Sequence, residues 1–124
     1  MLDIVIVNWN AGDQLQQCVS SIAEYHDDLV ESVVIVDNDS TDESLGAVEA
    51  SAAKLPFRLQ VLRNHHNAGF GAACNQGAAL CSREFVLFLN PDTRLFAGSL
   101  VKPLEFMGRP GNEPAKSRVS GLRK

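Results

Sequence analysis

Four short apolar runs, each followed by polar residues, constrain the fold of this chain more than any other feature. They span residues 2–7, 33–36, 58–62 and 85–89, and β-branched side chains dominate the first two. Continuous apolar runs of this length are typical of strands that are covered on both faces, as in a parallel sheet. The run at 58–62 alternates more, which suits a strand at the edge of a sheet.

Helical patterns separate these runs. Apolar residues recur at helical spacing over 15–23, and small residues dominate 69–81, so that helix can approach the sheet or a ligand closely. Ser40 and Glu43 have capping-box spacing, which predicts a helix from an N-cap at Ser40 to about residue 53. Successive strand and helix units of this kind predict an α/β fold with a parallel sheet and right-handed crossovers.

A weaker helical pattern covers residues 97–107 and includes Pro103, where a kink is expected. Beyond residue 108 the periodicity stops, and Pro and Gly are frequent. The chain is therefore interpreted as one domain over 1–108, followed by an irregular tail over 109–124.

Charge separates the same two parts. Residues 1–108 hold 14 acidic and 6 basic side chains, whereas residues 109–124 hold 1 acidic and 5 basic ones. An acidic body argues against a broad contact with nucleic-acid phosphates. Nucleic acid is therefore not an expected partner.

The sequence also indicates a compartment. No apolar run approaches the roughly 18 to 20 residues that span a bilayer, and the start lacks the basic segment of a signal peptide. Cys18, Cys74 and Cys81 have no C-x-x-C spacing and lie among apolar neighbours, as buried thiols of a reducing compartment do. We expect a cytoplasmic location, including the inner face of the membrane.

Polar residues follow every predicted strand. In an open parallel sheet, ligands bind at the carboxyl ends of the strands. Helix caps and Asx-turns would explain any single one of these exits, but their recurrence at all four favours a binding site. The exits are Asn8-Trp9-Asn10, Asp37-Asn38-Asp39, Asn64-His65-His66-Asn67 and Asn90-Pro91-Asp92.

One alternative comes from the second exit. Asp37, Asp39 and Thr41 match the D-x-D-x-[TV] pattern of haloacid-dehalogenase-type phosphatases, in which the first Asp is a nucleophile and the second an acid/base beside a metal. In that family the motif ends the first strand, whereas here it ends the second. The lysine and the later acidic motif of that site are also missing.

Four blocks taken in order resemble family 2 inverting glycosyltransferases, particularly rhamnosyltransferase-like members. The blocks are VIVNWN, VVIVDNDSTDES, NHHNAGFGAACNQG and FLNPDT, and the resemblance runs from Leu2 to about Leu104. It implies a GT-A fold with strand order 3-2-1-4 and transfer of a sugar, with inversion, from a UDP- or dTDP-sugar to a glycan or lipid-linked acceptor. Cell wall polysaccharide biosynthesis is the process implied.

The resemblance also implies roles for individual residues. Asp37 would accept the imide N–H of uracil or thymine, with Asp39 in the same pocket. Asn90-Pro91-Asp92 stands where the family has its D-x-D metal motif, so Asp92 would hold Mg²⁺ or Mn²⁺. The full set of implied nucleotide contacts is Asn8, Trp9, Asn10, Asp37, Asp39, Gly69, Asn75 and Asn90.

No residue of the chain is assigned as the general base, which is expected beyond Lys124. The chain is thus interpreted as a truncated donor-binding half of an enzyme, and a non-catalytic nucleotide-sugar-binding fragment is the alternative. An uncharged strand at 85–89 would be left as an open sheet edge. Such edges associate, so a homodimer through this strand is expected.

Overall fold

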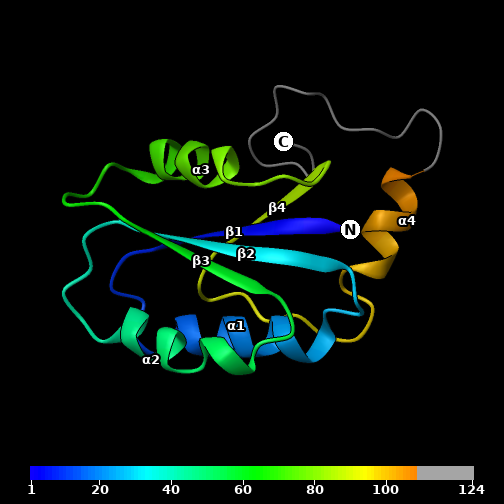
Figure 1. Cartoon of the computed structure of the whole chain (residues 1–124), viewed down its shortest axis with the longest axis horizontal. Helices are drawn as coiled ribbons and strands as arrows, with labels where there is room; N and C mark the ends of the chain where they lie inside the picture. Colours follow the sequence, from blue (N-terminus) through cyan, green and yellow to red (C-terminus); the bar gives the residue numbers. More distant parts are fainter. Residues whose placement is uncertain (109–124) are drawn as a thin grey trace.

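The computed structural model describes residues 1–108 as a four-stranded parallel sheet with helices on both faces (Figure 1). The strand order is β3-β2-β1-β4, so the predicted fold class and order are confirmed. The tail predicted over 109–124 lies outside the described residues. In chain order the elements are β1 (Leu2–Asn8), α1 (Asp13–Tyr25), β2 (Val30–Asp37), α2 (Ser44–Ala50), the 3₁₀ turn η1 (Ala52–Lys54), β3 (Arg58–Arg63), α3 (Phe70–Ala79), β4 (Phe85–Leu89) and α4 (Val101–Met107).

The core has two layers, because successive residues of a strand point to opposite faces. In β1, Ile4 and Ile6 pack in the layer that includes α1 and α2, whereas Val5 packs in the layer that includes α3. Figure 1 shows α1 and α2 on one side of the sheet and α3 on the other. The carboxyl ends of the strands consequently open between the loops that lead into these three helices.

The small residues of α3 do bring that helix close to the sheet. A methyl group placed on Gly77 would lie 2.5 Å from Cγ1 of Val5 and 3.1 Å from Cγ2 of Val36. Both distances are shorter than carbon atoms tolerate without movement. Gly77 is therefore the position that sets the separation between α3 and the sheet.

The predicted capping box at Ser40 and Glu43 is wrong. α2 begins at Ser44, with Glu43 as its N-cap residue and no capping bond from a side chain. The Ser40 hydroxyl instead donates to Oδ1 of Asp37 at 2.7 Å and accepts from the backbone amide of Asn10 at 2.9 Å. A hydrogen bond to a carboxylate is stronger than one between neutral groups, such as a helix cap would make. The Ser40 hydroxyl therefore bonds to Asp37 at the strand exit and does not cap α2.

Two helix boundaries also differ from expectation. The helix predicted to reach residue 53 ends as α2 at Ala50 and is followed by η1. α4 begins at Val101, which places Pro103 in its first turn. A proline is tolerated there because the first amides of a helix have no intrahelical acceptor. The helix therefore starts at Val101 and not at residue 97, and Pro103 lies near its start and not at a kink in its middle.

The three cysteines are buried, as predicted, and none of them forms a disulfide. Among residues 1–108, no helix has the length and hydropathy required to cross a bilayer.

Candidate functional site

The last residues of three neighbouring strands form a polar row at the carboxyl edge of the sheet. Asn8 of β1 pairs in register with Asp37 of β2, and Asp37 pairs with Arg63 of β3. Side chains in register on parallel strands point to the same face. The row therefore faces the layer of α1 and α2.

Asp37 is the centre of this row and is only 5% exposed. Its Oδ1 accepts hydrogen bonds from Nδ2 of Asn8 at 2.8 Å and from Oγ of Ser40 at 2.7 Å. Its Oδ2 accepts from the backbone amide of Ser40 at 3.0 Å. Because a carboxylate offers about four acceptor positions, Oδ2 retains room for one further donor.

Asn8 is held in one orientation. Its Nδ2 also donates to Oγ of Ser44 at 2.9 Å, while the carboxylate of Asp37 can only accept. The amide nitrogen therefore faces these oxygens. Within the described residues, the buried Oδ1 of Asn8 has no hydrogen-bond partner.

The turn after β1 is joined to the loop after β2. The Oδ1 of Asn10 accepts from the backbone amides of Thr41 at 2.8 Å and Asp42 at 3.3 Å. In return, Oδ2 of Asp42 accepts from the amide of Gly12 at 2.9 Å. The hydrogen bond from the Ser44 hydroxyl, helped by backbone amides, lowers the pKa of the Asp42 carboxyl. The clasp, as we call these contacts of Asn10 and Asp42 between the two loops, therefore includes a negative charge at neutral pH.

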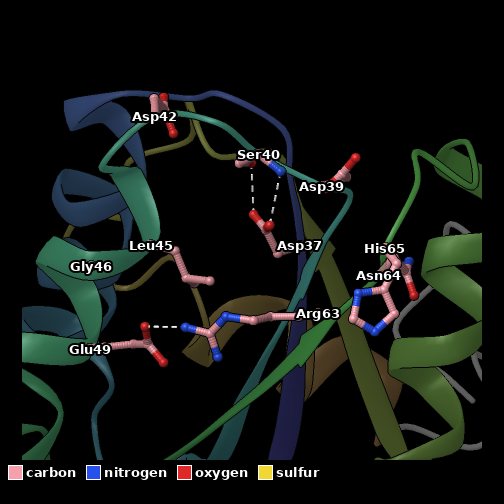
Figure 2. Close-up of a pocket in the computed structure, with 10 residues that line it drawn as sticks. All are labelled: Asp37, Asp39, Ser40, Asp42, Leu45, Gly46, Glu49, Arg63, Asn64 and His65. Atoms are coloured by element: carbon pink, nitrogen blue, oxygen red, sulfur yellow. Dashed lines mark hydrogen bonds and ion pairs between the residues drawn. The ribbon is translucent and has the colours of Figure 1, made fainter.

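A pocket of about 350 Å³ lies beside this clasp, between α2 and the end of β3 (Figure 2). Arg63 reaches from β3 toward Glu49 of α2, and the two form an ion pair. Asp37 and Asp39, which were predicted to share a pocket, both line it. The lining residues are Asp37, Asp39, Ser40, Asp42, Leu45, Gly46, Glu49, Arg63, Asn64 and His65.

Asn38 connects the β2 exit to the loop before α3. Its side chain is buried, and its Oδ1 accepts from Nδ2 of Asn64 at 2.9 Å. Its Nδ2 donates to the carbonyl of Gly69 at 3.3 Å. Gly69 has φ +86°, a conformation that favours glycine, and α3 begins directly after it.

The β4 exit forms a tight turn. The Thr93 amide donates to the carbonyl of Asn90 at 3.0 Å, with Pro91 and Asp92 as the central residues. The Asp92 side chain is exposed, and no described residue donates a hydrogen bond to it. Its carboxylate oxygens are thus available as hard ligands for a divalent cation.

No group of three or more His, Cys, Asp and Glu side chains within residues 1–108 could hold a metal ion. A cation at this edge would need further ligands from substrate phosphates and water, as Mg²⁺ commonly has. The exposed carboxylate of Asp92 fits that limited role. It does not fit a metal held by protein ligands alone.

The other predicted residues lie on several different segments. Trp9 is 58% exposed in the turn after β1, and Asp39 is exposed with φ +65°. Asn75 lies exposed on α3, and its side chain has no recorded hydrogen bond with the described residues. Asn90 contributes its backbone carbonyl to the β4 turn.

Several contacts were missed by the sequence analysis. Arg63 and Glu49 are 14 residues apart, and Asn38 and Asn64 are 26 apart. No local pattern links such pairs. Asn38 and Asn64 were noted only as polar residues at strand exits, and that is the signal that could have found them.

Comparison with known proteins establishes the family. The profile described as Glycosyl transferase family 2 matches residues 3–115. The chain therefore belongs to glycosyl transferase family 2, as the resemblance of the four sequence blocks implied.

Relatives of known name agree. The chain is 33% identical over 116 residues to a PGL/p-HBAD biosynthesis glycosyltransferase of Mycobacterium bovis, a match that covers 93% of this chain and 44% of the relative. It is 32% identical over 92 residues to an uncharacterized glycosyltransferase of Nostoc sp., covering 73% and 28%. The chain spans less than half the length of these relatives.

Solved structures show the same fold. The mannosyltransferase of Pyrobaculum calidifontis, in complex with GDP-Man and Mn²⁺, matches with a TM-score of 0.80 at 23% identity, over 88% of this chain and 32% of that one. Residues 1–349 of S. aureus TarS match with a TM-score of 0.73 at 30% identity, over 86% and 32%. The sheet is thus the GT-A arrangement.

The phosphatase alternative finds no support in these comparisons. Asp37, its candidate nucleophile, is 5% exposed, and both of its oxygens accept hydrogen bonds from the protein. A phospho-aspartyl cycle also needs the lysine and the later acidic motif that the sequence lacks. Asp37 is placed to hold a polar network, with one acceptor position left.

Proposed function

We propose that this chain is the donor-binding half of a glycosyltransferase that binds a UDP- or dTDP-sugar. The sugar would pass, with inversion, to a glycan or lipid-linked acceptor hydroxyl. Its residues would bind and orient the donor, and the general base of the reaction is assigned to none of the described residues.

One observation carries the proposal. Asp37 and Asp39 line the same pocket at the carboxyl edge of a GT-A sheet, and Oδ2 of Asp37 has an acceptor position left. An imide N–H of uracil or thymine is a single donor that suits one remaining acceptor position. Arg63 and His65 supply donors on the pocket wall for the flanking carbonyl groups of such a base.

A divalent cation is proposed to act with Asp92. Transfer of the sugar leaves a diphosphate with growing negative charge, and a bound Mg²⁺ or Mn²⁺ supplies the neutralising charge. Asp92 would hold the ion at the β4 exit, and the remaining ligands would be diphosphate oxygens and water. Residues 1–108 hold more acidic than basic side chains, so they offer little other compensation for that charge.

One of the two solved relatives supports a uracil nucleotide, whereas the mannosyltransferase of Pyrobaculum calidifontis was solved with GDP-Man. Residues 1–349 of S. aureus TarS have been solved with UDP and with UDP-GlcNAc, at 27% and 29% identity to this chain. dTDP-sugars remain the second candidate because thymine presents the same imide group as uracil.

Calorimetric titration with UDP and dTDP, with and without Mn²⁺, tests the proposal. Asp39→Asn keeps a residue that tolerates a positive φ and removes the carboxylate from the pocket. Asp28→Asn is the matched control, since Asp28 has φ +57° and does not line the pocket. We expect Asp39→Asn to weaken UDP binding and Asp28→Asn to leave it unchanged.

Asp37→Ala should weaken UDP binding further, by about 1 to 3 kcal/mol for a desolvated hydrogen bond. Because Asp37 also supports the fold, its circular dichroism spectrum and melting temperature are measured alongside. Equal UDP affinity for wild type and Asp39→Asn, together with equal affinity for a folded Asp37→Ala, would contradict the assignment of this pocket.

A non-catalytic nucleotide-sugar-binding module is the second candidate. It would use the same pocket, lined by Asp37 and Asp39, to hold the nucleotide sugar without a transfer step. Release of UDP from UDP-sugars in the presence of glycan acceptors distinguishes the two. Binding without turnover by this chain supports the module, and turnover supports the enzyme.

A further inference from the structure

The turn that presents Asp92 is closed by a backbone hydrogen bond. The Thr93 amide closes the turn on the Asn90 carbonyl at 3.0 Å. Pro91 occupies the position of a turn in which proline is favoured. The Asp92 side chain is exposed and receives no hydrogen bond from the described residues, so the turn backbone fixes the point from which its carboxylate extends.

The Arg94 side chain forms hydrogen bonds with the backbone of this turn. Its Nη1 donates to the carbonyl of Pro91 at 3.1 Å and to that of Thr93 at 2.8 Å. These two carbonyls flank Asp92 on either side. One nitrogen of the guanidinium therefore links the carbonyls on either side of Asp92, while the other nitrogen is left to bond elsewhere.

Two side chains of α1 then tie the turn to the body of the domain. Gln17 accepts through Oε1 from Nη2 of Arg94 at 2.6 Å. Ser21, one helical turn further on, accepts through Oγ from the Leu95 amide at 3.0 Å, and its hydroxyl donates to the Cys18 carbonyl at 2.7 Å. Ser21 is buried, so this bond is shielded from water.

We propose that Ser21, Gln17 and Arg94 are positioning residues for Asp92, which hold its carboxylate where a divalent cation and the donor diphosphate meet. The proposal rests on the function proposed above. A carboxylate on a loosened turn must be ordered again when the ion binds, which weakens the binding of the ion. Groups that orient a metal ligand typically contribute 10- to 100-fold to metal affinity.

The three residues differ in how cleanly they can be tested. Arg94 brings a positive charge close to the turn, and its removal would itself favour a cation. Arg94→Lys keeps the charge and loses the planar fork, so it isolates geometry. Ser21→Ala and Gln17→Ala change no charge.

α1 offers matched controls. Ser20 is exposed beside Ser21, and within the described residues its hydroxyl accepts only from Nε2 of Gln16, at 3.3 Å. Gln14 is exposed one turn before Gln17, and its side chain has no recorded hydrogen bond with the described residues. Ser20→Ala and Gln14→Ala thus make the same chemical changes on the same helix without touching the turn. Gln17→Glu retains an acceptor for Arg94 and serves as the conservative variant.

The experiment measures two affinities for each variant of the chain, together with its melting temperature. The first is the affinity for Mn²⁺ at saturating UDP, from the electron paramagnetic resonance signal of free Mn²⁺. The second is the affinity for UDP without metal, from calorimetry. A purely structural role would move both affinities, whereas a positioning role moves the first alone.

We expect Ser21→Ala to weaken Mn²⁺ binding about tenfold, and Gln17→Ala and Arg94→Lys about threefold. UDP affinity without metal should stay within about twofold of wild type. Ser20→Ala and Gln14→Ala should match wild type in both measurements. Gln17→Glu keeps the acceptor for Arg94 and adds a negative charge, so it should bind Mn²⁺ at least as tightly as wild type.

Wild-type Mn²⁺ affinity in Ser21→Ala, or a parallel loss of both affinities, would overturn the positioning role while leaving the proposed function intact. If the wild-type chain binds UDP but no Mn²⁺, the role of Asp92 and the positioning role both fail. If it binds neither, the proposed function fails and the positioning role with it.

Discussion

Asn8 and Asp37 are neighbours in the register of β1 and β2, and Nδ2 of Asn8 donates a 2.8 Å hydrogen bond to Oδ1 of Asp37. Asn8 is fully buried, and Asp37 nearly so. A buried carboxylate requires such donors to offset its lost hydration. This pair therefore holds together the two strand exits that carry most of the proposed nucleotide contacts.

Asn8→Asp should destabilise the fold strongly. The change would place a second carboxylate against Asp37 without altering shape, and an uncompensated buried charge costs about 3 to 5 kcal/mol. The folded variant would take up a proton to share between the two groups, so the destabilisation should shrink as the pH falls from 7 to 5. Urea unfolding at both pH values measures this.

The control for that variant is Asn10→Asp. The Asn10 side chain is exposed and acts as an acceptor for two backbone amides, a role that a carboxylate retains. Its stability should remain within about 1 kcal/mol of wild type. A similar loss in both variants would show that the Asn8 and Asp37 contact has no special weight.

Gly77→Ala should destabilise the chain by about 1 to 3 kcal/mol, because its methyl group would meet Val5 and Val36. The control is Gly71→Ala. Gly71 lies on the same helix, and a methyl group added there has no neighbour within 4 Å. That change should stabilise α3 by about 0.5 to 1 kcal/mol. Chemical denaturation of the two variants checks the opposite signs, and equal signs would contradict the close approach of α3 to the sheet.

The stability of the chain should fall between pH 9 and pH 11 through Cys18. Burial raises the pKa of the Cys18 thiol to about 11 from its ordinary value of 9.0. In that interval the unfolded chain loses the thiol proton and the folded chain keeps it, so the free energy of unfolding decreases as pH rises. The decrease attributable to Cys18 should reach about 2 to 3 kcal/mol.

Cys18→Ser removes this titration and nearly preserves size. Its free energy of unfolding, measured by urea titration from pH 8 to 11, should decline less steeply than that of wild type, although its value at pH 8 is lower. Parallel declines would mean that the Cys18 thiol has the same pKa in the folded and unfolded chains.

We expect the chain to self-associate through β4. Among residues 1–108, this strand pairs only with β1, and its uncharged sequence Phe85–Leu89 leaves one edge open. Light scattering after size exclusion should show a mass above that of a monomer, rising with concentration. Phe88→Lys should lower that mass while the circular dichroism spectrum is kept, and a monomeric wild type at all concentrations would contradict this expectation.

The sheet could be predicted from sequence because its information is local. Continuous apolar runs mark β1, β2 and β4, and the four polar exits mark the edge at which a ligand binds. The start of α2 could not be predicted, since Ser40 has two competing uses. Its hydroxyl serves Asp37 and Asn10 rather than a helix, and Asn10 lies 30 residues away in sequence.

The finer site depends on contacts between distant segments. The Arg94 guanidinium meets Gln17 across 77 residues, and Ser21 meets the Leu95 amide across 74. Nothing in the α1 pattern separates Ser21 from Ser20 or Gln17 from Gln14, because exposed and anchoring positions have the same residue types. Only the packing of the segment after β4 against α1 distinguishes them.

Mapping the binding of UDP and Mn²⁺ on the amide resonances of the ¹⁵N-labelled chain tests the central claim most directly. We predict that UDP shifts the signals of residues 8–10, 37–40 and 63–69, and that Mn²⁺, added with UDP, broadens those around Asp92 first. Asp92→Ala should abolish that localised broadening and retain the shifts caused by UDP. Shifts confined to other surfaces, or no shifts at UDP concentrations that saturate related enzymes, would contradict the assignment of this chain as a nucleotide-sugar-binding half.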